Sequence, residues 1–111
     1  MIDRLRGRAA FLRLRREGVR VRFDPLWCSF VHDQATQPPK VAFALGRALG
    51  PAVTRNRLRR RVRAILRDTD VPPGLLLIGA SRDACELTFA ELTIVVQSLI
   101  TRLSPIESPS T

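Results

Sequence analysis

The residues of this sequence that are best suited to chemistry are arginines, and they are concentrated in one stretch. Seven arginines and no acidic residue lie between Arg55 and Arg67. A guanidinium group is always charged, and its planar fork of N–H donors fits the oxygens of a phosphate. Like charges four positions apart on a helix repel each other, and Arg55, Arg59 and Arg63 form such a series. The stretch therefore predicts a surface that an anionic partner stabilises.

The net charge of +9 is unevenly distributed along the 111 residues. Residues 1–67 hold 17 basic residues against four acidic ones, and residues 68–111 hold two basic residues against six acidic ones. Such asymmetry indicates a polyanionic partner for the first two thirds of the chain. Charge alone does not distinguish RNA, DNA and an acidic membrane surface.

Other chemistry finds little support in the sequence. Cys28 and Cys85 lie far apart and form no Cys-x-x-Cys pair, so we expect two buried thiols in a reducing cytosol rather than a metal or redox site. No paired acids or His-Asp arrangement appears, so we expect no catalytic residue and no protein-bound metal or other cofactor. The chain has no apolar run of the ~20 residues that a membrane span needs and no secretory signal. A cytoplasmic location without a membrane partner is therefore expected.

The periodicity of apolar residues predicts seven elements in the order α-β-β-β-α-β-α. We expect them at residues 8–17, 19–23, 26–31, 40–47, 52–67, 75–80 and 88–103. This order predicts an α/β (α+β) two-layer sandwich, with one four-stranded sheet and helices against it. Residues 1–103 are expected to form a single domain, and the Ser/Pro-rich residues 104–111 a disordered tail.

The expected helix at residues 52–67 has two faces. Apolar residues recur at the spacing of one helical face, namely Leu58, Val62, Ile65 and Leu66. At 100° per residue, the opposite side collects Asn56, Arg59, Arg60, Arg63 and Arg67. The helix should therefore bury one face in the core and present the arginines to solvent.

This stretch resembles the Arg-Asn-Arg signature of the bacterial ribonuclease P protein family. The positions that match the signature are Arg47, Gly50, Ala52, Val53, Arg55, Asn56, Arg59, Arg60 and Arg63. Outside it, Arg4-Leu5, Phe11 and Gly18 suit the first helix of the family, and the resemblance covers roughly residues 4–103. Arg15 and Ser29 stand where the family can carry aromatic residues.

The resemblance implies an accessory subunit of a ribonucleoprotein that removes the 5′ leader from precursor tRNA. The chemistry would belong to the catalytic RNA and its Mg²⁺ ions. Contact with the ribonuclease P RNA is expected from Arg47, Arg55, Asn56, Arg59, Arg60, Arg63 and Arg67. A cleft for the single-stranded leader is expected from Phe11, Arg15, Arg20, Trp27, Ser29 and Lys40. Phe11 and Trp27 could stack on unpaired bases, although each also fits core packing.

Three alternatives use the same features differently. A ribosomal or other structural RNA-binding protein would need the same arginine helix but would have no processing role. A DNA-binding regulator would need a short helix before residues 52–67 and mixed polar residues that read base edges, so no DNA partner is expected. A free-standing protein nuclease would need clustered acids or histidines, and the acidic residues here are few and scattered.

Overall fold

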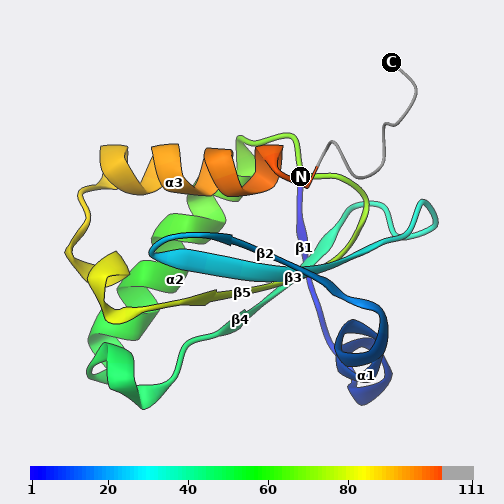
Figure 1. Cartoon of the computed structure of the whole chain (residues 1–111), viewed down its shortest axis with the longest axis horizontal. Coiled ribbons are helices and arrows are strands. Elements are labelled where there is room, and N and C mark those ends of the chain that lie inside the picture. The colour runs from blue at the N-terminus through cyan, green and yellow to red at the C-terminus, as the bar shows by residue number, and fades with distance from the viewer. Residues whose placement is uncertain (104–111) are drawn as a thin grey trace.

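The computed structural model describes residues 1–103 of the chain, in which five strands, three α-helices and two 3₁₀ helices are found (Figure 1). In chain order they are β1 (Asp3–Arg4), α1 (Arg8–Glu17), β2 (Val19–Phe23), β3 (Leu26–His32), β4 (Lys40–Ala44), η1 (Arg47–Leu49), α2 (Ala52–Arg67), β5 (Gly74–Ala80), η2 (Arg82–Glu86) and α3 (Phe89–Thr101). The predicted bounds of α1, α2 and β2 are confirmed. The tail predicted at residues 104–111 lies outside the described residues.

The strands form one mixed sheet in the order β1-β4-β5-β3-β2. The central strand β5 is antiparallel to β3 and parallel to β4, and β1 is parallel to β4. The predicted sheet of four strands was therefore wrong by one strand. β1 has two residues, too few to show a period of two, and it is held by the N–H groups of Asp3 and Leu5, which donate to Pro39 O and Val41 O at 2.8 and 2.9 Å. Arg4 and Leu5 accordingly lie before α1 rather than in it.

The other predicted bounds change: β3 ends one residue later, β5 begins one residue earlier and α3 begins one residue later than predicted, and the ends of β4 and α3 differ by more. The strand expected at residues 40–47 ends at Ala44, and Arg47–Leu49 forms η1 instead. The last helix ends at Thr101 and begins with a capping box, in which Thr88 Oγ1 accepts from the N–H of Glu91 and the Glu91 carboxylate accepts from the N–H of Thr88. This pairing satisfies two N–H groups that a helix start otherwise leaves without partners.

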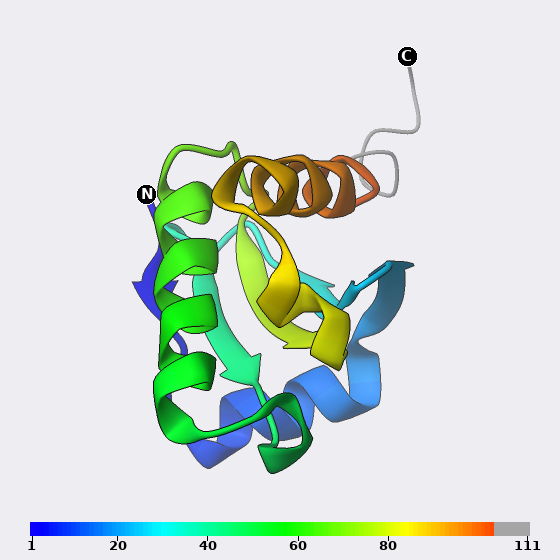
Figure 2. The same cartoon turned by 90° about the vertical axis from the view of Figure 1, so that its left-hand side faces the viewer.

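Helices cover both faces of the sheet, though to different extents (Figures 1 and 2). Successive strand residues point to opposite faces, so β3 buries Leu26, Cys28 and Phe30 in the large core shared with α2 and α3. On the other face a small cluster joins α1 to the sheet, and its buried members are Leu5, Leu14, Val31 and Leu75. The two-layer prediction therefore describes the α2/α3 side, while α1 adds a partial third layer and leaves the rest of that face open.

The two cysteines are free thiols in different settings. Cys28 is fully buried and Cys85 half-buried. Burial raises the pKa of the Cys28 thiol to about 12, so this group stays protonated and unreactive at neutral pH. No helix within residues 1–103 is both long and apolar enough to cross a membrane.

Candidate nucleic-acid interface

The exposed side of α2 carries the arginines that the sequence predicted. Leu58, Val62, Ile65 and Leu66 are buried in the large core, which turns the basic side chains outward as the periodicity required. Within residues 1–103 the ion pairs with carboxylates are made by Arg13 and Arg22, and none by an arginine of α2. The positive charge of α2 is therefore not neutralised by the described part of the protein.

A groove runs between α2 and the edge of the sheet at β1 and β4. Its wider part, with a volume of about 320 Å³, is lined by Arg4, Leu5, Val41, Ala42, Phe43, Arg59 and Arg63. Its narrower part, about 190 Å³, is lined by Ile2, Asp3, Arg4, Arg63 and Arg67. Arg4 and Arg63 border both parts, so we treat them as one feature, the arginine groove. Four guanidinium groups from two elements converge there, against the single carboxylate of Asp3.

Arg63 is at the centre of the arginine groove. Its guanidinium carbon lies 5.5 Å from the centroid of the Phe43 ring, a cation–π arrangement. The pKa of Arg63 is lowered, first by burial and then by the positive charges of Arg4, Arg59 and Arg67. Burial and the neighbouring positive charges both disfavour the charged form of the Arg63 guanidinium, which has no anionic partner among the described residues to stabilise it.

The remaining residues predicted to contact RNA are spread around this groove. Asn56 lies one turn before Arg59 and accepts a hydrogen bond from it through Oδ1. The Arg55 side chain donates from Nε to the carbonyl of Gly50 at 3.2 Å, beside the start of α2. Arg60 is exposed on α2, and Arg47 is exposed on η1. The structure thus joins Arg59, Arg63 and Arg67 in the groove, and Arg47, Arg55 and Arg60 do not line it.

Arg4 is a groove residue that the sequence did not single out for RNA contact. The resemblance assigned it to the first helix of the family, outside the helix predicted at residues 8–17, but it ends β1 and reaches the arginine groove from there. The parallel pairing of Arg4 with Val41 sets this position. A strand of two residues gives no periodic signal, so only the strong basic character of residues 1–8 hinted at it.

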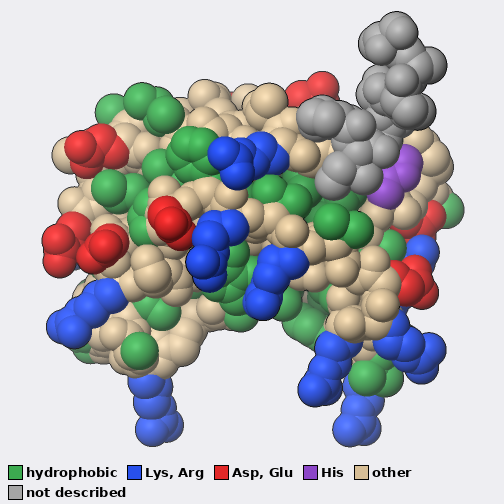
Figure 3. All heavy atoms as spheres, in the orientation of Figure 1, with side chains coloured by type: hydrophobic (Ala, Val, Ile, Leu, Met, Phe, Trp, Pro, Cys, Tyr) green, Lys and Arg blue, Asp and Glu red, His purple; other side chains and the backbone are tan. Residues whose placement is uncertain are grey.

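A second hollow lies on the open face of the sheet beside α1, with a volume of about 480 Å³. It is lined by Phe11, Leu14, Arg15, Gly18, Arg20, Trp27, Ser29 and Leu77, and we call it the α1 cleft. Figure 3 shows the hollow below the sheet, with Lys and Arg side chains projecting on both sides of it. Five of the six residues predicted for the leader cleft meet here. Lys40 does not line it, because it begins β4, opposite Leu75 rather than Leu77.

The floor of the α1 cleft is built by close packing. The Trp27 ring lies directly over Gly79, where any side chain would collide with it. The Arg20 guanidinium carbon lies 4.2 Å from the centroid of the Trp27 ring. Gly18 allows the end of α1 to meet Ser29, since a Cβ at this position would collide with Ser29 Oγ. Trp27 is half-buried and borders the cleft, and Phe11 is 41% exposed. Neither ring is therefore fully buried in the core.

Arg13, on α1, already has carboxylate partners within the protein. Arg13 Nη1 lies 2.8 Å from Asp33 Oδ2, and Arg13 Nε lies 3.2 Å from Glu17 Oε1. The bond to Asp33 fastens α1 to the segment after β3, and the bond to Glu17 lies within α1. Arg13 therefore positions α1, while Arg15 and Arg20 line the cleft.

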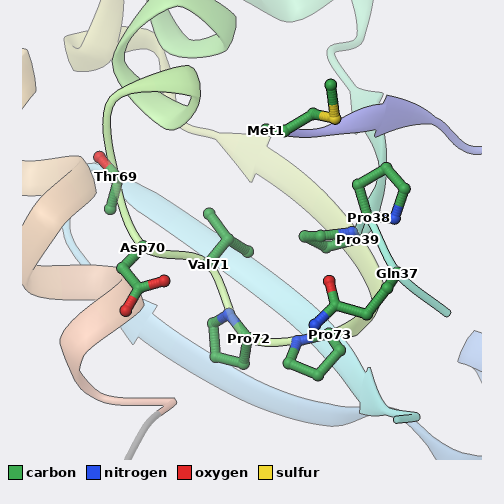
Figure 4. Close-up of a pocket in the computed structure, with 9 residues that line it drawn as sticks. All are labelled: Met1, Gln37, Pro38, Pro39, Thr69, Asp70, Val71, Pro72 and Pro73. Carbon is green, nitrogen blue, oxygen red and sulfur yellow. The ribbon is translucent and has the colours of Figure 1, made fainter. Parts of the chain in front are cut away.

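A third hollow, with a volume of about 550 Å³, shares no lining residue with the arginine groove or the α1 cleft. Two proline-containing segments face each other across it, with Met1 at the rim (Figure 4). It is lined by Met1, Gln37, Pro38, Pro39, Thr69, Asp70, Val71, Pro72 and Pro73. The one side chain with a formal charge there is Asp70, which does not suit a phosphate. Within residues 1–103, no three His, Cys, Asp or Glu side chains cluster as a metal site would require.

The fold and its two basic hollows define a small α+β protein whose exposed surfaces suit an extended polyanion. The family model described as Ribonuclease P matches residues 2–104. The ribonuclease P protein component of Beutenbergia cavernae is 38% identical over 104 residues, covering 91% of this chain and 87% of the relative. That of Symbiobacterium thermophilum is 35% identical over 102 residues and covers 89% of each chain.

Solved structures show the same fold. The ribonuclease P protein of Thermotoga maritima superposes with a TM-score of 0.79 at 24% identity, covering 90% of this chain and 96% of the other. A mutant ribonuclease P protein of Staphylococcus aureus gives a TM-score of 0.82 at 16% identity, covering 91% and 87%. The chain belongs to the ribonuclease P protein family. It is therefore an accessory subunit of a ribonucleoprotein that matures the 5′ end of tRNA, as the signature at residues 47–63 predicted.

Proposed function

We propose that this protein holds the ribonuclease P RNA with the exposed side of α2 and the single-stranded leader of precursor tRNA with the α1 cleft. The catalytic RNA and its Mg²⁺ ions would perform the hydrolysis. The protein would contribute affinity and position to the complex. No DNA or membrane partner is part of this proposal.

One observation carries the assignment of α2 to the catalytic RNA. Its arginines have no carboxylate partner in the described chain, and three of them converge with Arg4 in one groove. Phosphate oxygens would supply the missing negative charge through short, charge-assisted hydrogen bonds. A folded RNA presents many phosphates at fixed positions, which suits a row of arginines on a rigid helix.

The α1 cleft has the composition of a site for unpaired nucleotides. Trp27 and Phe11 offer aromatic surface, and stacking of a base on such a ring contributes about 1–3 kcal/mol. Arg15 and Arg20 line the same cleft and suit the phosphates that link the bases. The α1 cleft lies on the α1 face of the sheet, whereas the arginine groove lies at the edge of the sheet beside β4. The protein could therefore bind the ribonuclease P RNA and the precursor tRNA leader at the same time.

Reconstitution tests the proposal directly. The full chain would be added to a bacterial ribonuclease P RNA at low Mg²⁺, and cleavage of a precursor tRNA would be followed with and without protein. We expect cleavage at the mature 5′ end that depends on the protein. Tight binding to this RNA without any stimulation of cleavage would favour a purely structural RNA-binding role instead.

A further inference from the structure

The edge of β4 is left open inside the arginine groove. β1 pairs with β4 through only two residues, and its ladder ends at the pair Arg4 and Val41. Among residues 1–103, no strand pairs with this edge beyond Val41. Because Val41 O accepts from β1 and alternate residues direct their backbone groups to the same side of a strand, the N–H and C=O of Phe43 are directed to this edge.

The groove therefore combines three kinds of contact. Its lining carries guanidinium groups and the half-buried Phe43 ring, and its strand edge offers one backbone donor and one backbone acceptor. The guanidinium of Arg63 lies over the Phe43 ring, and this contact favours that orientation. A planar guanidinium held in this way can stack on a nucleobase.

We propose that the arginine groove takes one unpaired nucleotide of the RNA partner. Its base stacks on the Arg63–Phe43 pair and bonds to the backbone of Phe43, and Arg4, Arg59 and Arg67 hold the phosphates on either side. The assignment rests on the proposed function for the identity of the partner as RNA. It adds a base-reading subsite, and Arg4 as a contact, to a surface otherwise described by phosphate binding.

The shape of the groove favours a nucleotide over a bare phosphate. A site for phosphate alone needs only donors, whereas the half-buried Phe43 ring adds an aromatic surface to the lining of this groove. The proposed stacking on Arg63 and Phe43 also requires an unpaired nucleotide. In a duplex the face of each base is covered by the neighbouring bases, so it is not free to stack on a side chain.

The first test compares two arginines that are two residues apart. Arg4 lines the groove, and Arg6 is exposed and does not line it. Each Arg→Ala change removes one positive charge from the same segment. Equilibrium binding of the full-length variants to ribonuclease P RNA should weaken about tenfold for Arg4→Ala and less than twofold for Arg6→Ala. Equal losses would overturn the role of Arg4.

The second test distinguishes a site that binds the base of a nucleotide from a site that binds phosphate alone. A 5′-phosphorylated tetra-adenylate and an abasic ribose-phosphate strand of equal charge would be titrated into the full chain carrying Trp27→Ala, which removes one of the two aromatic rings of the α1 cleft. The NMR signal of the Phe43 backbone N–H should shift and saturate with the tetra-adenylate, at an affinity at least fivefold above that for the abasic strand. Equal affinities would show a phosphate site only, and an unmoved Phe43 signal with both strands would place the base elsewhere; either result overturns the proposal.

The two failures are distinguishable. If the unmodified protein neither binds ribonuclease P RNA nor supports cleavage, the proposed function is wrong. If it does both while the Arg4 and Arg6 variants behave alike, only the nucleotide site is wrong. Thermal unfolding of both variants provides the check on folding, and both changed side chains are exposed.

Discussion

At the scale of single residues, the arginines differ in whether the protein supplies their partners. Arg13 has two carboxylates within hydrogen-bond distance, and it fastens a helix. Arg59 and Arg63 have none among the described residues, and they border an open groove. The same side chain thus serves structure in one place and recognition in the other, and the difference is whether an acidic residue lies within reach.

The double variant Arg59→Ala with Arg63→Ala should weaken binding to ribonuclease P RNA on the order of 100-fold. Two charge-assisted hydrogen bonds are lost, and each contributes about 1.5 kcal/mol or more. Filter binding or fluorescence anisotropy at constant salt measures the change.

The matched control is the double variant Arg57→Ala with Arg61→Ala. It removes the same charge from the same helix, but from the flank that faces η2. Its loss of affinity should be several times smaller. An affinity that falls equally in both double variants would indicate that α2 acts through total charge rather than through the groove.

Trp27→Ala should reduce affinity for precursor tRNA more than for mature tRNA in the reconstituted holoenzyme. The lost stacking of about 1–3 kcal/mol per base corresponds to roughly 5- to 150-fold for the leader-bearing substrate. The control is Leu12→Ala, which removes an exposed apolar side chain of α1 that does not line the cleft. Equal losses for both tRNAs would assign Trp27 to packing.

At the scale of elements, α1 forms one side of the α1 cleft. α1 packs on the sheet through the small cluster around Leu14 and Leu75 rather than through the large core. Its second attachment is the pair formed by Arg13 and Asp33. An element held by so few buried side chains is sensitive to the loss of one contact.

The Asp33 attachment should depend on pH. The pKa of Asp33 is lowered, first by the hydrogen bond from Arg13 and then by bonds from Ala35 and Thr36. The ionised form is thus favoured in the folded state, so its contribution is complete above the unfolded-state pKa of about 3.9 and is lost as the pH falls through the lower folded-state value.

Asp33→Asn should therefore lower the free energy of unfolding near neutral pH, and its difference from the unmodified protein should shrink as the pH falls from about 5 towards 3. Urea unfolding at a series of pH values measures this difference. Asp24→Asn, in a longer and more exposed ion pair with Arg22, provides the control. A difference for Asp33→Asn that stays constant down to pH 3 would contradict the assignment.

At the scale of the whole molecule, basic side chains gather on one side. In Figure 3 several Lys and Arg side chains project below the sheet, while red side chains lie at both the left and the right of the molecule. Among the acidic residues, Asp83, Glu86 and Glu91 belong to η2 and the start of α3. Basic side chains that project on one side attract a polyanion to that side of the protein.

Binding to ribonuclease P RNA should consequently depend steeply on salt. If four to six phosphates are neutralised, the logarithm of the association constant should fall against the logarithm of salt concentration with a slope of roughly −3 to −5. Titrations at several concentrations of monovalent salt measure the slope. A nearly flat dependence would remove the argument from phosphate contacts.

Local patterns in the sequence determined most elements of this protein. The 3.6-residue period of Leu58, Val62 and Leu66 sets both the extent of α2 and the outward direction of its arginines, because both follow from the geometry of a single helix. The alternation in β3 likewise places Trp27 and Ser29 on the face opposite Cys28. The residues that carry the family signature are close in sequence, so they could be recognised without the fold.

Only the tertiary structure decided which separate segments meet. β1 exists because Asp3 and Leu5 bond to a strand more than thirty residues away, and two residues cannot show a period by themselves. The place of Arg4 in the arginine groove and the absence of Lys40 from the α1 cleft both follow from strand pairing. Pairing register and the packing of α1 depend on contacts between distant residues, and such contacts leave no periodic trace in a single sequence.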